Sequence, residues 1–594
     1  MFTRSIQKIA IVAFAGLASI ARADLPAALD LIPADVAITG GIENLERFQT
    51  NMAAFRKASG GDAPNQDLAK LDLFFQMPGM NKSGSAAIAI VGELPQGGKG
   101  PGATDNMSDM PLIVLAPISD YALLVTTMGA DPAAAVAEIK GPQNTWYVKN
   151  SGNGYIVASP KRELTESFEP KPGNLEAHKK NLGVVGGRAA SKGDFVIIAN
   201  IPKLGGQIKN AANNATKGLD QIAAMQGGDA PNMALLSSLT DTFVRDAQVG
   251  VISSTISEAG LSLDLASQFK EGTELAGLFN SKGSTTTLTG ALPNKPFLLA
   301  FALDTTSAGF KKLFQGAIDM QQPAAKEGEK SAPSMLNMFV NNMKSMEGMS
   351  GIIGYPKGGL AAGLFSETVF FMKTPDAGSL QKSTGDGLTA MNGLVQDANK
   401  YITTYDVGSS EIGGTKVDSW TLDMQPADPA MGDGGMGMVK GFLTGPAGKF
   451  QGVVAPVKGG LIMTYTQYEP IVAAVLKTAS EGNGLSKGLE SAAAALPPDR
   501  SFELFLGTKS IMETISGVMG MFGQAPMPVP AEIPHIALGG TSDSGGIQLR
   551  TIVPATVFKA LADARKNMQG PDPMDEEPVE PATKEDKKDT KPKF

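Results

Sequence analysis

One order of segments recurs in the two halves of this 594-residue sequence, and the recurrence limits the possible folds more than any single motif does. Ile32-Pro33-Ala34 opens the first series, and Leu292-Pro293-Asn294 opens the second. In both halves a short apolar run follows, and then a stretch with apolar residues on one helical face, at 42–55 and at 307–320. The recurrence predicts that the chain contains two related halves.

Further pairs of segments follow in the same order. An apolar strand leads into Asp120 in the first half and into Asp376 in the second, and each aspartate stands where a helix would use it as an N-cap. The only two tryptophans, Trp146 and Trp420, fall in predicted strands at matching places in the two series. Later predicted strands pair as 155–159 with 461–465, and as 194–198 with 500–505.

Each half also closes with a predicted β-hairpin that has a glycine-containing turn. The paired strands are 251–255 with 261–265 in the first half, and 536–541 with 547–551 in the second. The offset between corresponding residues is 256 positions for Asp120 and Asp376, and 286 positions for Thr255 and Thr541. The offset varies along the chain, but the order of segments is the same in both halves. The alternative to a duplication is that the chain has two unrelated α+β domains whose strands and helices happen to alternate in a similar order.

We therefore predict an α+β fold of two tandem pseudo-repeat halves, each a largely antiparallel sheet with packed helices. The predicted boundaries are 24–283 for the first half and 284–565 for the second. Residues 566–594 are rich in proline and charged residues and poor in apolar ones. A segment of that composition cannot bury enough apolar surface to fold, so we predict a disordered tail.

The first residues have the pattern of a secretory signal peptide, residues 1–23. Arg4 and Lys8 precede an apolar stretch at 9–21, and Ala21-Arg22-Ala23 is a small-x-small cleavage site. The apolar stretch is shorter than the roughly twenty residues that span a bilayer. We expect a periplasmic or secreted protein without a transmembrane anchor.

Charge and cysteine content exclude several classes of partner and site. The sequence has no cysteine, so it has neither disulfides nor a lipid anchor on cysteine. The formal charge is −8, and it falls to −11 when Arg4, Lys8 and Arg22 leave with the signal peptide. A net acidic surface argues against nucleic acid as a partner. We expect a partner in the cell envelope or outside the cell.

The sequence Ser542-Asp543-Ser544-Gly545-Gly546 resembles the region around the catalytic serine of chymotrypsin-like proteases. That chemistry needs a histidine to activate the serine and a carboxylate to orient the histidine. Only His178 and His535 are present, and the same position in the first half is a plain hairpin turn. We therefore interpret the motif as a turn.

Other candidate sites are also better explained by packing or turns. Met335, Met338, Met343, Met346 and Met349 fall near helical spacing, and thioethers bind Cu(I), but methionine is also an ordinary core residue. Zinc-type, calcium-loop and phosphate-loop patterns are missing from the sequence. We therefore assign no catalytic, cofactor-binding or metal-ligating residue and expect no cofactor.

Three short motifs in the first half resemble a group of exported bacterial repeat proteins of unknown function. They are Ile118-Ser119-Asp120-Tyr121, Gly154-Tyr155-Ile156-Val157-Ala158-Ser159-Pro160 and Gly193-Asp194-Phe195. The resemblance covers most of the first half and is weaker in the second. It implies a secreted or periplasmic repeat protein and brings no catalytic residue with it.

Three hypotheses for function follow from these patterns. The first is an exported cell-envelope protein that acts by binding or scaffolding and is not an enzyme. The second is a secreted hydrolase that uses carboxylates or a serine not visible from the spacing, and it would gain support if a serine, one of the two histidines and a carboxylate met in one cleft. The third is a carrier of an apolar ligand, because amphipathic helices are predicted beside sheets.

Overall fold

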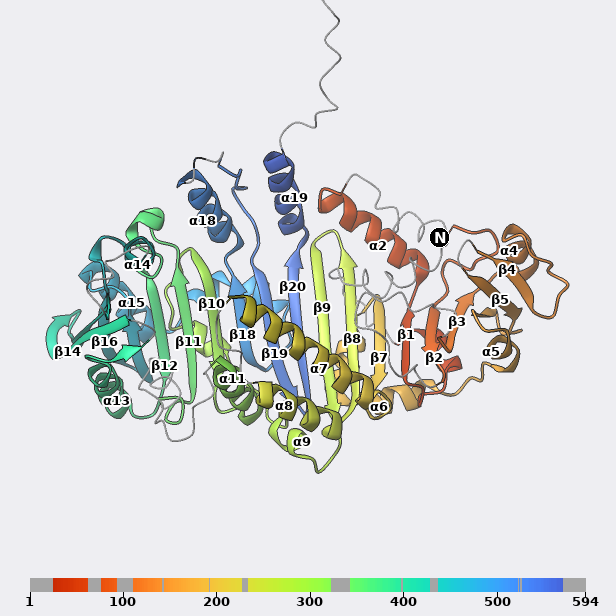
Figure 1. The fold of residues 1–594 in the computed structure, drawn as a ribbon, viewed down its shortest axis with the longest axis horizontal. Helices are drawn as coiled ribbons and strands as arrows, with labels where there is room; N and C mark the ends of the chain where they lie inside the picture. The colour runs from red at the N-terminus through yellow and green to blue at the C-terminus, as the bar shows by residue number, and fades with distance from the viewer. Residues whose placement is uncertain are drawn as a thin grey trace, which may run out of the picture.

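A computed structural model of the chain describes residues 25–61, 76–92, 110–141, 144–191, 193–226, 233–321, 342–396, 399–427, 436–521, 523 and 526–569. Within these ranges every strand belongs to one twenty-stranded sheet, and every strand pair is antiparallel. Helices cover both faces of the sheet (Figure 1). The α+β class is confirmed, but the chain builds one continuous sheet where we expected a separate sheet in each half.

The strands of the first half lie in the order β4-β5-β6-β3-β2-β1-β7-β8-β9 across the sheet. Their bounds are β1 Ile38–Ile42, β2 Ala86–Ile90, β3 Leu112–Pro117, β4 Ala137–Lys140, β5 Thr145–Asn150, β6 Tyr155–Ser159, β7 Phe195–Asn200, β8 Ala247–Ser257 and β9 Gly260–Phe269.

The strands of the second half lie in the order β13-β14-β15-β16-β17-β12-β11-β10-β18-β19-β20, and β20 pairs with β9. Apart from β13 and β14, this is the order of the first half. The bounds are β10 Phe297–Asp304, β11 Gly348–Gly354, β12 Thr368–Lys373, β13 Val395–Gln396, β14 Asn399–Ile412, β15 Thr415–Pro426, β16 Phe450–Val457, β17 Gly460–Thr464, β18 Arg500–Leu506, β19 Ile536–Asp543 and β20 Gly546–Pro554.

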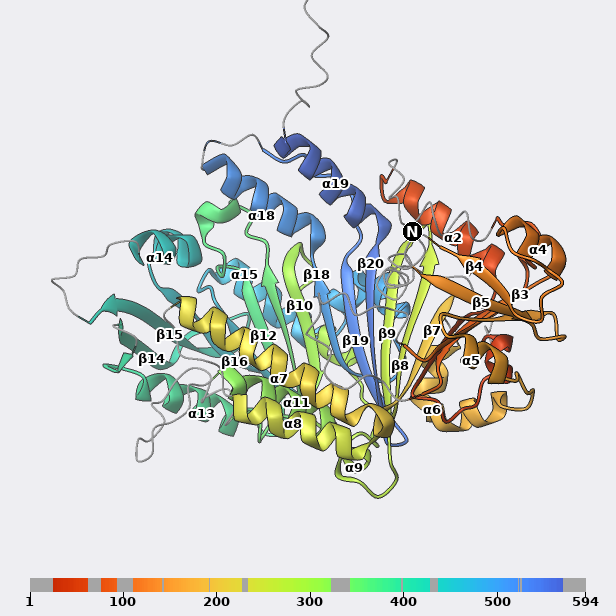
Figure 2. The same cartoon turned by 45° about the vertical axis from the view of Figure 1, so that its right-hand side comes forward.

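Helices at both ends of the strands lie on the face of the sheet that is turned to the viewer in Figures 1 and 2. In both views α2, α18 and α19 follow one end of the strands, and α7, α8 and α11 follow the other end. They are α2 Leu45–Ala58, α7 Ile201–Gln226, α8 Met233–Asp246, α11 Ala308–Gln321, α18 Thr508–Met521 and α19 Ala555–Gln569.

The opposite face is covered by α6 Leu175–Ala190 in the first half and by α15 Glu469–Glu481, α16 Leu485–Gly488 and α17 Glu490–Ala494 in the second. Shorter helices occupy connections and sheet ends. They are η1 Ala27–Leu31, α4 Tyr121–Thr127, α5 Arg162–Ser167, α9 Glu274–Leu278, α10 Thr286–Thr289, η3 Gly359–Ala362, α14 Met436–Thr444 and η5 Gly445–Ala447. A longer helix, α13 Ala377–Ala390, follows β12.

Local signals in the sequence explain where several elements begin. The Asp120 carboxylate accepts a hydrogen bond from the Leu123 amide at 3.0 Å and caps α4. Asp376 caps α13 in the same way, through the Ser379 amide at 2.9 Å. Both predicted N-caps are confirmed, and each satisfies a backbone donor that the first turn of a helix leaves free.

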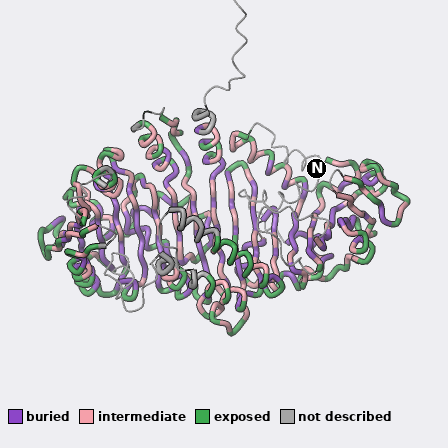
Figure 3. The backbone as a smooth tube through the Cα atoms, viewed as in Figure 1, coloured by how far each residue is buried: buried purple, intermediate pink, exposed green. Residues whose placement is uncertain are grey.

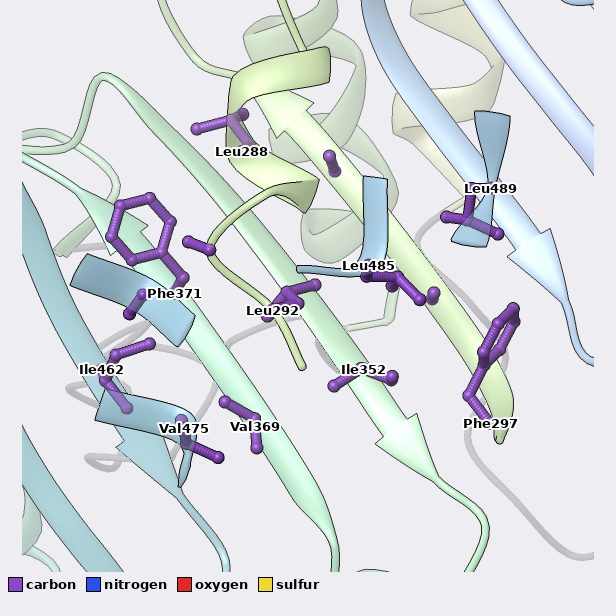
Figure 4. Packing of buried hydrophobic residues seen from close by; sticks show 14 of the residues in the cluster. Leu288, Leu292, Phe297, Ile352, Val369, Phe371, Ile462, Val475, Leu485 and Leu489 are labelled. Carbon is purple, nitrogen blue, oxygen red and sulfur yellow. The ribbon is translucent and has the colours of Figure 1, made fainter. Parts of the chain in front are cut away.

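The core consists of layers between sheet and helices, and buried residues follow the strands along most of the sheet (Figure 3). The largest cluster joins β10, β11 and β12 to α15 and α16, with Ile352, Val475 and Leu485 among its buried residues (Figure 4). A corresponding cluster joins α6 to β7, β8 and β9 in the first half. These layers supply the hydrophobic burial that a chain without disulfides requires.

Two expectations need correction. Trp146 lies on β5, which pairs directly with β6, whereas Trp420 lies on β15 and β16 separates it from β17. The tryptophans are therefore not at equivalent positions, because β16 takes the place beside β17 that β5 takes beside β6. The predicted tail boundary at 566 also falls inside α19, which continues to Gln569. The signal peptide and residues 570–594 lie outside the described residues.

Candidate binding surface at the centre of the sheet

The two closing hairpins meet edge to edge where β9 pairs with β20. Their turns are 286 positions apart in sequence, and the same offset takes Asp264 to position 550. Asp264 faces Arg550 in this pairing. Four residues away on either side, Gln268 faces Gly546 and Gly260 faces Pro554, and the offset of 286 exchanges these two pairs. The two hairpins are therefore related by a local two-fold axis that passes between Asp264 and Arg550.

A buried charge pair lies on this axis, on the side of the sheet covered by α6. Arg550 Nε donates to Asp264 Oδ1 at 2.9 Å, and its Nη2 donates to Oδ2 at 2.8 Å. Gln548 Nε2 also donates to Asp264, at 2.6 Å, and Arg550 Nη1 donates to the Ala495 carbonyl at 3.2 Å. Asp264 is 0% exposed and Arg550 4% exposed. Charges so deeply buried are tolerable only when they are paired and hydrogen-bonded, as these are.

The opposite side of the same strands is apolar and incompletely covered. Ile197, Ile252, Leu265 and Leu549 face one another in turn across β7, β8, β9 and β20. Leu265 is 41% exposed, and the other three are partly exposed. Because paired residues point to the same side of a sheet, these four side chains form one row.

A second row, next to the first, is its counterpart in the other hairpin. Leu263, Thr551, Leu538 and Leu504 face one another in turn across β9, β20, β19 and β18, and all four are partly exposed. At the offset of 286 positions, Leu265 corresponds to Thr551 and Ile252 corresponds to Leu538. We call these eight residues of the two rows the seam face.

Helices pack on both sides of the seam face along the strands. Met512 of α18 and Val557 of α19 form a cluster with Ile536 and Val553, towards one end of β19 and β20. Towards the other end, the Phe310 ring of α11 lies over Gly540, where an added Cβ would come within 2.6 Å of it. Leu549 of the seam face packs against the cluster that contains Phe310, and Ile197 packs against the cluster that contains Phe48 of α2. Leu265 lies between these packed regions.

The alternation of β9 is the reverse of the usual pattern in a half-exposed strand. Ser262 and Asp264 point to the α6 side and are 1% and 0% exposed, whereas Leu265 on the other side is 41% exposed. Antiparallel sheets usually bury the apolar side and expose the polar side. The exposed apolar side makes the seam face a candidate binding surface.

The structure separates the residues that a serine hydrolase would need. His178 is 1% exposed and its Nε2 lies 2.9 Å from the Ile32 carbonyl oxygen. His535 stacks against Phe297 with a ring separation of 4.7 Å, and it precedes β19, whereas Ser542 lies near the far end of that strand. Ser542 is seven positions along the strand from this histidine, a separation of roughly 23 Å.

The protease-like motif is a hairpin turn, as the sequence indicated. Ser544 and Gly545 have φ angles of 49° and 74°, which a tight two-residue turn requires. Ser542 Oγ donates to the Ser281 carbonyl at 2.5 Å. Burial lowers the pKa of both His178 and His535, so each favours its neutral form. Nothing in this arrangement activates Ser542 or Ser544 as a nucleophile.

The methionines that resemble a copper motif divide into two groups. Met343, Met346 and Met349 are buried in an apolar cluster, with exposures of 1%, 4% and 2%. Met335 and Met338 lie outside the described residues. Across the described ranges no three His, Cys, Asp or Glu side chains gather in a way that could hold a metal ion, and no helix is long and apolar enough to cross a membrane.

Sequence reasoning found the two hairpins but missed the seam face. The signal was present in the alternation of Leu261, Ser262, Leu263, Asp264 and Leu265, although the alternation does not say which side is covered. Fold and surface together define an α+β protein with a partly exposed apolar face where two hairpins join. Comparisons with models of protein families, with curated proteins and with solved structures find no match for this chain.

Proposed function

We propose that this chain is an exported binding protein without enzymatic activity, made of two related halves, and that it binds an apolar ligand on the seam face. The observation that carries the proposal is the row of aliphatic side chains at the junction of the hairpins, with Leu265 41% exposed at its centre. The carrier hypothesis is contradicted by a closed, fully packed space between sheet and helices, and the 41% exposure of Leu265 supports the proposal at this point.

The internal duplication rests on the shared strand order and on the constant offset within the hairpins. Leu265 and Thr551 are related by the offset of 286, as are Ile252 and Leu538. Export rests on the signal-peptide pattern of residues 1–23. Two-fold related halves bring equivalent surfaces together at their axis, which makes the junction a natural place for a shared binding site.

A neutral fluorescent apolar dye, N-phenyl-1-naphthylamine, tests the proposal directly. We expect saturable fluorescence enhancement with the wild-type protein and at least a tenfold weaker affinity with Leu265→Asp. The charge would lie in the middle of the apolar row, and excluding the dye from one leucine-sized contact removes about 1.5–3 kcal/mol.

Val407→Asp is the matched control, because Val407 is 81% exposed on β14, far across the sheet from β9. Both variants should unfold at nearly the wild-type urea concentration, since neither replaced side chain is buried. Equal dye affinity in Leu265→Asp and Val407→Asp, or no saturable binding to the wild type, would refute the proposed function.

A further inference from the structure

Three Asn-Gly pairs occur in the sequence, at Asn153-Gly154, Asn392-Gly393 and Asn483-Gly484. Asparagine is one of the thermally labile residues of proteins. The carbon of its side-chain amide can be attacked by the backbone nitrogen of the next residue, and glycine leaves that approach open because it has no Cβ. The three pairs share this chemistry, but the structure gives their glycine nitrogens different surroundings.

The first pair lies in the turn between β5 and β6, and both of its residues are exposed. At Gly154 φ is 75°, and a Cβ added there would meet nothing within 4 Å. Within the part of the chain that the structure describes, neither the Gly154 N–H nor the Asn153 side-chain amide has a hydrogen-bond partner. The two groups that would react are therefore unconstrained by other contacts.

Hydrogen bonds hold the base of this turn. The Ser151 N–H donates to the Tyr155 carbonyl at 3.0 Å, and the Gly152 N–H donates to Asn150 Oδ1 at 2.9 Å. The backbone N–H of Asn153 donates to Ser151 Oγ at 3.4 Å, which leaves the Asn153 side chain free to rotate. Loop motions occur in nanoseconds to microseconds. The side chain can therefore sample the geometry for attack, in which the reacting atoms are about 3–3.5 Å apart.

The second pair, Asn392-Gly393, is held by β14 at both reacting groups. The Gly393 N–H donates to the Tyr401 carbonyl at 2.8 Å. Asn392 Oδ1 accepts a hydrogen bond from the Thr403 N–H at 3.1 Å. The attack would require both hydrogen bonds to break first, so this pair is protected although Asn392 is exposed.

The third pair, Asn483-Gly484, is fixed by packing of its glycine. The Gly484 N–H donates to the Gly290 carbonyl at 2.8 Å. Gly484 is buried, and a Cβ added there would lie 1.9 Å from the Leu292 carbonyl oxygen. Asn483 is exposed, but the nitrogen that would attack it cannot move without disrupting this contact.

We propose that Asn153 is a site of spontaneous deamidation, at which the folded protein acquires aspartate and isoaspartate as it ages. The Gly154 nitrogen forms a bond to Asn153 Cγ, and the side-chain nitrogen leaves as ammonia with the proton that Gly154 loses. Water then opens the resulting cyclic imide at either of its two carbonyl carbons, which gives aspartate or isoaspartate. Water is the only co-reactant, and no electrons are exchanged.

The modification changes the charge of the turn without removing a contact that holds the sheet. Either product replaces the neutral Asn153 amide with a carboxylate, so the protein becomes more acidic. Strands β3, β2, β1, β7 and β8 lie between β6 and β9. We therefore expect the modified protein to keep its strand pairing and its affinity for N-phenyl-1-naphthylamine, so the inference is independent of the proposed function.

Peptide mapping by mass spectrometry tests the proposal on all three pairs in one sample. The folded wild-type protein is aged at physiological temperature and mildly alkaline pH, and is then digested with pepsin in acid, where the reaction is slow. We expect deamidation at Asn153 to accumulate at least about tenfold faster than at Asn392 or Asn483, because their glycine nitrogens are held. Asn153→Gln should abolish the acidic species that isoelectric focusing detects in the aged wild type.

Ageing in urea separates protection by the fold from differences in local sequence. Unfolding frees the glycine nitrogens of all three pairs, so the three rates should converge. Equal rates at the three sites in the folded protein, or an acidic species that persists in Asn153→Gln, would overturn the inference. The same selectivity for Asn153 in urea would also overturn it, because the fold would then not be the cause.

Discussion

Replacing Arg550 with methionine tests whether the charge pair on the local two-fold axis holds the two hairpins together. The substitution removes the hydrogen bonds that Arg550 Nε and Nη2 donate to Asp264, at distances of 2.8–3.0 Å. Asp264 is 0% exposed and would retain only Gln548 as a side-chain partner. Breaking a buried pair by removing one member typically costs 3–5 kcal/mol, so we expect a loss of about 4 kcal/mol in the free energy of unfolding.

The assay is urea unfolding followed by tryptophan fluorescence and circular dichroism. Arg550→Met should lower the unfolding midpoint strongly, whereas the double variant Asp264→Leu/Arg550→Met should recover most of the loss, because no unpaired charge remains buried. The reasoning would be refuted by a loss under 1 kcal/mol in Arg550→Met, or by a double variant that is less stable than the single one.

Three further predictions concern local features. Gly545→Ala should cost about 1–2 kcal/mol in unfolding free energy, because φ at this position is 74°; unchanged stability in urea would contradict the turn geometry. Asp120→Ala and Asp376→Ala should each cost about 1 kcal/mol by the same measurement, and a null effect would show that the caps do not stabilise α4 and α13. Burial lowers the pKa of His178, so the unfolded chain takes up a proton at this residue before the folded protein does. The stability contribution of a neutral His178 is therefore present above about pH 6.5 and declines as the pH falls below that value. The stability difference between the wild type and His178→Gln should shift in favour of the variant between pH 7 and 5, and a difference independent of pH would refute this.

Short-range features of the fold could be predicted from sequence because local chemistry determines them. The turn at Ser544-Gly545 needs residues that tolerate positive φ, and the caps at Asp120 and Asp376 need a short side-chain acceptor. The pairing of β9 with β20 was not predictable in this way. It joins segments that are far apart in the chain, and no turn or helix connects them directly.

The tryptophans show how a sequence match can mislead. Trp146 and Trp420 both lie in strands, and both strands precede the segment that became β6 or β17. An additional strand, β16, lies between the Trp420 strand and β17, and the sequence comparison of the two halves did not include it. Strand pairing therefore shifts Trp420 one position outward in the sheet, although the order along the chain is unchanged.

The charge pair also bears on why both hairpins belong to one chain. In a symmetric homodimer a residue on the two-fold axis faces its own copy, so an aspartate would meet an aspartate. Here the equivalent positions hold Asp264 and Arg550, which attract each other and satisfy each other's hydrogen bonds. Only a chain that carries two different copies can place opposite charges at that point.

The same asymmetry explains how an apolar face can stay partly open beside the axis. The α6 side of the junction is closed by the Asp264–Arg550 pair and by its hydrogen bonds to Gln548 and Ala495. The backbone ladder between β9 and β20 also joins the hairpins. Leu265 is 41% exposed, so we expect substitutions there to change affinity for the proposed apolar ligand more than stability.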